Sequence, residues 1–310
     1  MDVGGTKVAL RVQDGAGGGH VTDDVFRWDT TSDAEQDLDL LAERVRALLR
    51  RHRSPLSGVA VAMPAVCDAD GTVLTWPGRP SWVGLDLTAA LSRILPDTPV
   101  VCADDGDLAA LAEAREAGCA NLLYLGVGTG IGGGLVVEGR SWPGPGRGSC
   151  EIGHVIVDRA GPLCDCGRHG CVQATASGPA TLRRAAEFRR REVTFAELSE
   201  ASAAAVPWAR AALEESAAAV ARAIVGVSEL AHPELALVGG GFAAGMPHFV
   251  TEVAARVAEL TRPGVTPVPV RPAALGARSS LYGALLLAEE GSGRTVASGS
   301  ERRTAAVKTV

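Results

Sequence analysis

The residues best suited to chemistry gather in one glycine-rich loop. There His154 is followed by three cysteines, Cys164, Cys166 and Cys171. One imidazole and three thiolates are the ligand set that a closed, tetrahedral structural zinc ion takes. The glycines and the proline between these residues interrupt any regular period and let the chain turn tightly enough to bring the thiolates together. The spacing therefore predicts a zinc-binding loop over residues 154–171.

Two other interpretations of the cysteines are weaker. A loop of free cysteines would leave three reactive thiols on the surface without a role. A disulfide is disfavoured because the chain has seven cysteines, an odd number, and its N-terminus has no charged segment followed by an apolar stretch. We therefore expect a reducing, cytoplasmic location, where such a spacing more often means metal.

Two glycine-rich turns could hold phosphate groups. One is Gly4-Gly5-Thr6 between two short apolar segments, and the other runs from Gly128 to Gly134 between apolar segments at 121–127 and 135–138. Glycines let backbone N–H groups approach a phosphate without interference from Cβ, and Asp2 can hold a metal ion or its waters. A Gly-Gly turn alone is a weak signal, because most are plain hairpins. The repetition of strand, turn and strand in both halves strengthens the interpretation.

The rest of the chain predicts an α/β protein of two domains. With 310 residues, 46% of them hydrophobic, it is long enough for two ordinary cores. We expect an N-terminal α/β domain over residues 1–104, a C-terminal α/β domain over 105–290 that carries the zinc loop, and a disordered tail over 291–310. A helix at 280–290 could return to the N-terminal domain.

Two of the expected helices depend on local signals. A helix from Ser32 to Arg51 is predicted by its amphipathic pattern, and Ser32 and Glu35 have the spacing of a capping box. Residues 181–205 also have the composition of one continuous helix.

Composition also excludes some classes of partner. A net charge of −6 with a pI near 5.6, and no cluster of Lys or Arg, gives no electrostatic footprint for nucleic acid. No apolar run approaches the ~20 residues that a membrane-spanning helix needs. We expect no nucleic-acid partner and no membrane insertion.

Five features share one order and spacing, namely the Asp2-x-Gly-Gly-Thr opening, the second glycine turn, Glu151-x-x-His154, the cysteine triplet and Gly239-Gly240-Gly241. Together they resemble the ROK family (repressors, open reading frames and sugar kinases) of the actin-like ATPase superfamily. The resemblance covers the chain from Asp2 to about Glu290. It implies two actin-like, ribonuclease H-like α/β domains around a substrate cleft, with a sugar at the junction and ATP between the glycine turns.

The resemblance also implies residue roles. Asp105, aligned by counting back from Glu113, would accept the proton of the sugar hydroxyl that attacks the γ-phosphate, with Mg²⁺ neutralising charge. His154 would bind zinc through one ring nitrogen and meet a sugar hydroxyl with the other. The alternative is that Asp104 or Asp105 is only a helix N-cap, and both roles can hold if one residue caps while the other faces the cleft. The residues implied to contact the sugar are Asp104, Glu151, His154, Gln173 and Gly78. Those implied to contact ATP are Asp2, Gly4, Gly5, Thr6, Lys7, Gly128, Thr129, Gly130, Gly239, Gly240 and Gly241.

Three positions depart from the usual pattern of sugar kinases in this family. Asp104 stands where Asn is usual, Gln173 where Glu is usual, and Gly78 where Asn is usual. Asp104 adds a negative charge beside Asp105 and near Glu151, and a neutral hexose offers nothing to offset it. An ammonium group on the sugar would, and because the Asn of the family sits near the 3- and 4-hydroxyls, we expect 3-amino-3-deoxyglucose (kanosamine), phosphorylated on its 6-hydroxyl.

Family members that act on this aminosugar belong to antibiotic precursor pathways. The alternatives are a glucokinase, a kinase of a C7-cyclitol or another modified sugar, and a non-catalytic sugar-binding protein. The last is disfavoured because Asp105 and both glycine turns are present.

Two further expectations come from the same resemblance. Repressors of the family carry a winged helix-turn-helix domain ahead of the Asp-x-Gly-Gly-Thr motif, whereas one residue precedes Asp2 here, so we expect an enzyme. One residue also gives the first strand little length, and we expect the natural start to lie a few codons upstream. A homodimer or homotetramer is the expected assembly.

Overall fold

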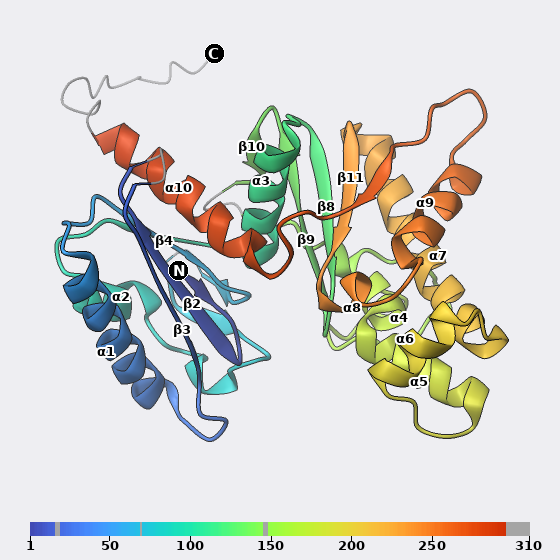
Figure 1. Ribbon diagram of the computed structural model, residues 1–310, viewed down its shortest axis with the longest axis horizontal. Coiled ribbons are helices and arrows are strands. Elements are labelled where there is room, and N and C mark those ends of the chain that lie inside the picture. The colour runs from blue at the N-terminus through green and yellow to red at the C-terminus, as the bar shows by residue number, and fades with distance from the viewer. Residues whose placement is uncertain (16–18, 69, 145–147, 296–310) are drawn as a thin grey trace, which may run out of the picture.

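The computed structural model describes residues 1–15, 19–68, 70–144 and 148–295. Its framework is a pair of five-stranded sheets (Figure 1). The first has the order β3 (Val21–Arg27), β2 (Lys7–Gln13), β1 (Asp2–Val3), β4 (Val59–Ala62) and β7 (Val100–Ala103). The second has the order β10 (Arg140–Trp142), β9 (Ile131–Val137), β8 (Leu122–Val127), β11 (Leu235–Gly239) and β12 (Val270–Pro272).

The two sheets share one plan. In each, a hairpin (β1–β2, β8–β9) is followed by strands that add in parallel: β4 beside β1 and β7 beside β4, and then β11 beside β8 and β12 beside β11. Because the carboxyl ends of parallel strands meet at one edge, the loops that follow them gather there. The predicted α/β class and the repeated strand–turn–strand unit are confirmed.

One face of the first sheet is covered by α1 (Ala34–His52) and α2 (Leu87–Ile94). The core beneath them contains three tryptophans, Trp28, Trp76 and Trp82. A two-stranded ribbon of β5 (Val66–Cys67) and β6 (Val73–Thr75) and the short 3-10 helix η1 (Pro80–Trp82) close this layer.

The start of α1 differs from the prediction by one residue. Asp33 is the N-cap, and its carboxylate accepts a hydrogen bond from the Gln36 backbone N–H while the Gln36 side chain accepts one from the Asp33 N–H. The predicted box of Ser32 and Glu35 is therefore wrong. Ser32 instead donates from its hydroxyl to the buried Asp37 carboxylate, which fixes the loop ahead of the helix.

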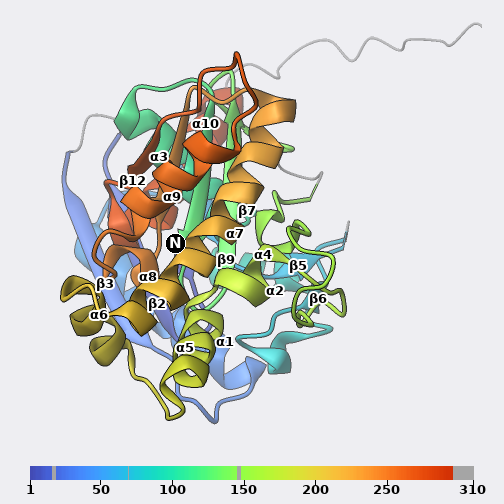
Figure 2. The same cartoon turned by 90° about the vertical axis from the view of Figure 1, so that its right-hand side faces the viewer.

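The outer face of the second sheet carries the helices that follow the cysteine loop (Figure 2). These are α4 (Val172–Ala176), α5 (Gly178–Arg189), α6 (Phe195–Ala203), α7 (Pro207–Ala231), α8 (Gly241–Ala244) and α9 (Phe249–Leu260). The single helix expected over 181–205 is wrong. The chain leaves α5 at Arg190, which has a positive φ of 54°, and α6 begins after Thr194, which forms a capping box with Glu197.

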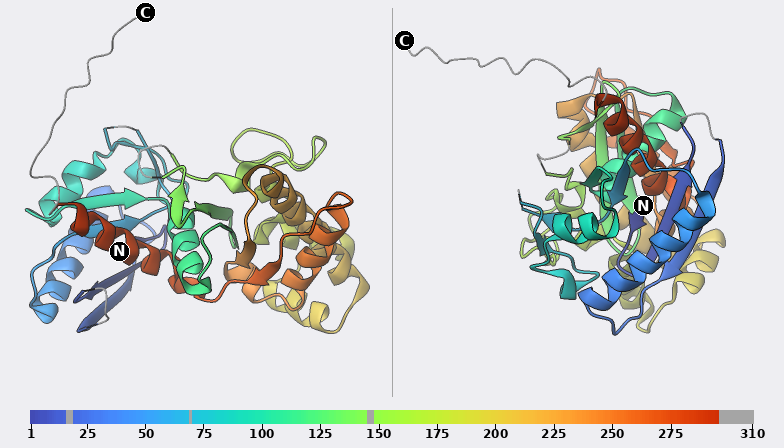
Figure 3. Two further views of the ribbon diagram at one scale, coloured as in Figure 1. Left: turned by 90° about the horizontal axis from the view of Figure 1, so that it is seen from above. Right: turned by 90° about the vertical axis from the view of Figure 1, so that its left-hand side faces the viewer.

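Between the two sheets lie α3 (Asp105–Ala117) and α10 (Ser279–Thr295), packed on each other (Figures 1 and 3). A Cβ on Gly283 would lie 1.9 Å from the Leu108 carbonyl oxygen, so only glycine allows the two helices to approach this closely. α10 also packs against β4 of the first sheet. It extends five residues beyond the end expected at Glu290, so residues 291–295 of the predicted tail are helical. Residues 296–310 lie outside the described residues, and the domain boundary at residue 104 stays a prediction.

Three glycines predicted to lie in the second phosphate turn belong to a strand instead. β9 begins at Ile131 and includes Gly132, Gly133 and Gly134. A Cβ on Gly134 would lie 2.7 Å from the Ala110 Cβ, and one on Gly133 would lie 2.2 Å from the Tyr124 carbonyl oxygen. Gly134 thus lets α3 press onto the sheet, whereas Gly133 avoids a clash with the neighbouring strand β8. The turn itself is confined to residues 128–130.

No helix in the described part of the chain is both long and apolar enough to cross a bilayer.

Buried Glu113 ties α3 to the segment that enters α10. Its carboxylate accepts hydrogen bonds from the Ala274 and Leu275 backbone N–H groups, both at 2.9 Å, and from the Ser279 hydroxyl at 2.7 Å. The side chain is fully buried.

We expect Glu113→Gln to lower the free energy of unfolding by about 2–3 kcal/mol, because the NH₂ group of the glutamine would face a hydrogen-bond donor. Urea denaturation measures this, with exposed Glu116→Gln on the same helix as control, and equal stabilities of the two variants would contradict the assignment.

Candidate active site

The start of α3 holds a cluster of carboxylates, of which Asp107 is buried and Asp104 and Asp105 are half-buried. Asp104 caps the helix, accepting hydrogen bonds at one carboxylate oxygen from the Gly106 N–H at 2.9 Å and the Asp107 N–H at 3.3 Å. Asp105 is the first helical residue. Asp2 leads into β1, and its carboxylate accepts a hydrogen bond from the Ser280 hydroxyl at 2.9 Å. The structure thus assigns the cap to Asp104.

The pKa values of these carboxyl groups are raised. The pKa of Asp104 is raised to about 7 by burial and then by the charge of Asp107, and the pKa of Asp105 is raised to about 7 by burial and then by Asp104 and Asp2. Burial also raises the pKa of Asp2. This agrees with the expectation that crowding drives at least one carboxylate towards protonation. The cluster carries more negative charge than its surroundings compensate.

Asp107 belongs to this cluster, although sequence reasoning missed it. Its pKa is raised to about 7 by burial and by the charges of Glu151 and Asp105, and its carboxylate accepts a hydrogen bond from the Cys150 N–H at 3.3 Å. The signal was its spacing, because a residue three positions after Asp104 lies on the same face of a helix.

The first glycine turn packs against the loop after β6. The Gly4 N–H donates to the Lys7 carbonyl, and the Trp28 indole donates to the Gly4 carbonyl at 2.8 Å. A Cβ on Gly5 would lie 3.0 Å from the Cα of Gly78. Gly78 therefore lies against the phosphate turn, where a side chain as large as Asn would crowd Gly5.

The second glycine turn is closed by hydrogen bonds on three sides. The Gly128 N–H donates to the Gly130 carbonyl, the Gly178 N–H at the start of α5 donates to the Gly128 carbonyl, and the Ile131 N–H donates to the Gln173 side chain. The Thr129 and Gly130 N–H groups have no hydrogen-bond partner among the described residues. Free backbone donors on a rigid turn are what a phosphate group requires.

The run Gly239, Gly240 and Gly241 lies beside the second turn. Gly239 pairs with Gly126 across the parallel strands. Gly240 has a φ of +86°, and a Cβ there would lie 2.5 Å from the Val127 backbone. The structure thus brings together two of the three glycine runs that the resemblance assigned to ATP.

The segment from Glu151 to His154 lies between the carboxylate cluster and the cysteines. It forms the 3-10 helix η2 (Ile152–His154), and a Cβ on Gly153 would lie 1.9 Å from the Ile131 carbonyl oxygen. Glu151 is exposed and its charge contributes to the raised pKa of Asp107. Residues predicted to contact the sugar and residues predicted to contact phosphate therefore lie close together.

The proposed zinc ligands are close together. One ligand atom from each of His154, Cys164, Cys166 and Cys171 lies within 4.8 Å of the others. His154 Nδ1 is 3.7 Å from Cys164 Sγ, and Cys166 Sγ is 3.6 Å from Cys171 Sγ. A hydrogen bond from Arg168 lowers the pKa of the exposed Cys166 thiol to about 6. The donor set fits zinc, and Nδ1 on the cysteine side leaves Nε2 of His154 for another contact.

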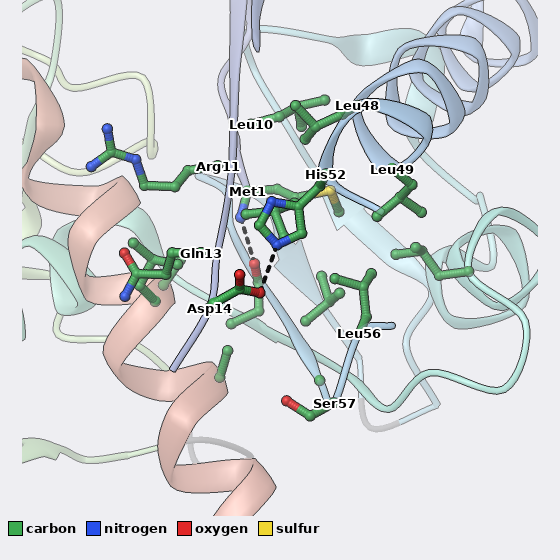
Figure 4. A pocket seen from close by; sticks show the side chains of 18 of the residues that line it. Met1, Leu10, Arg11, Gln13, Asp14, Leu48, Leu49, His52, Leu56 and Ser57 are labelled. Carbon is green, nitrogen blue, oxygen red and sulfur yellow. Dashed lines mark hydrogen bonds and ion pairs between the residues drawn. The ribbon is translucent and has the colours of Figure 1, made fainter. Parts of the chain in front are cut away.

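A cavity of about 390 Å³ lies elsewhere, between β2, α1 and α10 (Figure 4). Its walls are mainly apolar, and His52 pairs with Asp14 at 3.1 Å beside it. None of the predicted site residues lines it. The predicted site and this cavity are therefore separate parts of the molecule.

Residues 1–291 match the model of the family described as ROK. The chain belongs to the ROK family. Kanosamine kinase of Amycolatopsis mediterranei (strain S699) is 54% identical to this ROK chain over 288 residues, covering 93% of the chain and 94% of that protein. N-acetylmannosamine kinase of Yersinia pestis (strain Pestoides F) is 27% identical over 290 residues, covering 93% and 97%.

Solved structures agree with this ROK assignment. The ROK hexokinase of Thermus thermophilus is 29% identical with a TM-score of 0.82, covering 94% of this chain and 98% of that one. A ROK glucokinase of Streptomyces griseus, in complex with glucose and AMPPNP, is 25% identical with a TM-score of 0.77 and the same coverage. The fold of the ROK chain is therefore that of sugar kinases.

The carboxylate cluster of this ROK protein makes its stability depend on pH. A carboxyl group whose pKa is about 7 when folded and near 3.8 when unfolded stabilises the folded state fully below pH 3.8. That contribution is lost as the pH rises through 7, by up to about 1.4 kcal/mol per pH unit for each group. We expect Asp104→Asn, which keeps a capping side chain, to raise the unfolding temperature of ligand-free protein more at pH 8 than at pH 5, because less of the contribution has been lost at pH 5. Calorimetry at both values measures this, and a gain independent of pH would contradict the charge argument.

The zinc loop gives a second prediction. Purified protein should contain one equivalent of zinc, and Cys166→Ser should lower both metal content and thermal stability, because metal binding contributes folding free energy. Elemental analysis and a thermal melt measure the two effects. Cys119→Ser, which changes a cysteine outside the loop, is the control, and zinc that survives loss of any two of the three loop cysteines would contradict the ligand set.

Proposed function

We propose that the protein transfers the γ-phosphoryl group of ATP to the 6-hydroxyl of kanosamine. The observation that carries this proposal is the partly buried carboxylate cluster at the start of α3, where three acidic side chains lie together in the same region as two turns able to hold phosphate. The kanosamine kinase that is 54% identical over most of the chain supports the same substrate.

Asp105 is the residue proposed to accept the proton of the attacking hydroxyl. It lies at the helix start, and its pKa is raised to about 7. A carboxylate with a raised pKa is a stronger base than an ordinary one, and a base is most effective when its pKa lies near the working pH. The neighbouring Asp104 has one oxygen engaged in capping, so its role differs from that of Asp105.

The phosphate side of the site would be held by backbone donors. The Thr129 and Gly130 N–H groups of the second turn and the Gly4-Gly5-Thr6 turn are proposed to contact the phosphates of ATP, with Lys7 nearby. Asp2 is an oxygen donor of the kind that Mg²⁺ or its waters prefer, and its raised pKa is consistent with a nearby cation that would stabilise its charged form. When bound, Mg²⁺ would neutralise charge on the phosphates.

The ammonium group of the substrate is proposed to lie near Asp104, Asp107 and Glu151. At ~4 Å and an effective dielectric near 20, one ion pair is worth on the order of 4 kcal/mol before desolvation. A neutral hexose gains none of this energy. His154 Nε2 is proposed to meet a sugar hydroxyl, with its ring aimed by zinc on the other side.

We further propose a structural zinc ion in the cysteine loop, a homodimeric or homotetrameric assembly, a cytoplasmic location, and a place in antibiotic precursor synthesis. These follow from the family resemblance and from the donor set of the loop.

Selectivity tests the proposed substrate. We expect kcat/KM to be highest for kanosamine when kanosamine, glucosamine and glucose are compared side by side. Asp104→Asn should reduce the preference for kanosamine over glucose at least about fivefold, which corresponds to a loss of a quarter of the ion-pair energy. If glucose is the best substrate of the native protein, or if Asp104→Asn leaves the preference unchanged, the proposal is wrong.

The proposed base gives a separate test. Asp105→Asn should lower turnover by about 10²–10⁴-fold, because it removes the base. ATP affinity should change little, because no phosphate donor is lost. Steady-state kinetics and nucleotide titration measure the two quantities, and a rate within about tenfold of the native protein would point to Asp104 instead.

A further inference from the structure

Gln173 lies where three parts of the site meet. It is the second residue of α4, directly after the loop that ends in Cys171. Its Oε1 accepts a hydrogen bond from the Ile131 N–H at 3.1 Å, at the point where the second glycine turn becomes β9. A Cβ on Gly130 would lie 3.0 Å from the same oxygen, and one on Gly153 would lie 3.4 Å from it. One side-chain oxygen therefore touches the phosphate turn and the segment that carries Glu151 and His154.

This arrangement differs from the role that sequence reasoning gave to Gln173. The resemblance implied a contact with the sugar, whereas the side-chain oxygen points into the glycine turn and is already engaged there. The Ile131 N–H occupies one acceptor site of this oxygen and fixes the direction of the side chain toward the turn.

The position of the bond determines what it can control. The Gly128 N–H and Gly130 carbonyl close the turn from within, and the Gly178 N–H holds its first residue. The Gln173 side-chain oxygen holds the other end of the turn by accepting a hydrogen bond from the Ile131 N–H. With both ends fixed, the intervening Thr129 and Gly130 N–H groups are held in one direction, which lowers the entropy lost when they bind an anion.

We propose that Gln173 is a positioning residue for ATP, which acts through the second glycine turn and holds that turn against the Gly153 segment. Its acceptor oxygen is the feature that matters. The charge that distinguishes Glu from Gln is not required for this bond, because either side chain presents an oxygen to the Ile131 N–H. The inference rests on the proposed kinase function, and it assigns Gln173 to the nucleotide side of the site.

Two substitutions separate this role from a sugar contact. Gln173→Leu removes the acceptor at similar length, and Gln173→Glu keeps it. We expect Gln173→Leu to raise the KM for ATP roughly fivefold to tenfold, because the turn loses about one hydrogen bond and becomes less ordered. The KM for kanosamine should stay within about twofold of the native value, and Gln173→Glu should keep the native KM for ATP.

Thr175→Val is the matched control. Thr175 lies on the same short helix, and its hydroxyl donates to the Cys171 carbonyl at 3.3 Å. This hydrogen bond does not involve the glycine turn. Thr175→Val should lower thermal stability without changing the KM for ATP. If it raises that KM as much as Gln173→Leu does, general loosening of α4 explains the effect and the proposal is overturned.

Titration with a non-hydrolysable ATP analogue in the absence of sugar keeps this test independent of the substrate. Weaker binding by Gln173→Leu and native-like binding by Gln173→Glu support the proposal even if no tested sugar is phosphorylated. A higher KM for kanosamine with unchanged nucleotide affinity would assign Gln173 to the sugar, and unchanged values for both ligands would show that the bond to Ile131 has no role.

Discussion

The close packing of α3 on its neighbours is the constraint on which the site depends. Gly106 of α3 and Gly134 of β9 let the helix press onto the second sheet, and Gly283 lets α10 press onto the helix. In a close-packed interior, such contacts leave little freedom to shift. The first turn of α3 therefore has a fixed place between the sheets, and the carboxylates of Asp104, Asp105 and Asp107 are positioned by the body of the helix.

Burying these carboxylates near one another is unfavourable in the ligand-free protein. Desolvation is the first cause of the raised pKa of each. A helix N-terminus offsets part of the cost through its free N–H groups, as the capping bonds to Asp104 show. A bound cation would relieve the part of this cost that capping does not offset. The arrangement that lowers the stability of the free protein therefore raises its affinity for a cationic ligand. The same clustering that weakens the free protein thus favours a charged substrate over a neutral one.

Much of this organisation was readable from the sequence, because the features concerned are local. The Asp-x-Gly-Gly-Thr turn, the spacing of His154 and the cysteines, and the helix that begins at Asp105 each depend on a few adjacent residues. Two of the features that were missed depend on contacts between distant segments. Gly132 to Gly134 resemble a turn in the sequence, and only contacts with β8 and α3 explain why the strand has glycine at positions 133 and 134. The partner of Gln173, 42 positions away at Ile131, could not be predicted from spacing.

The place of α10 has a consequence for how the chain folds. Its residue Ala284 packs in one cluster with Leu108 of α3 and with Ala60 and Ala62 of β4. The inner face of the first sheet is thus covered by some of the last described residues to leave the ribosome. Until α10 has been synthesised, β4 exposes an apolar face, so the first sheet depends on a C-terminal helix to complete its packing. Contacts between segments so far apart in the sequence generally form slowly. In synthesis from the N-terminus, the inner face of the first sheet can be covered by α10 only after nearly the whole described chain has been made.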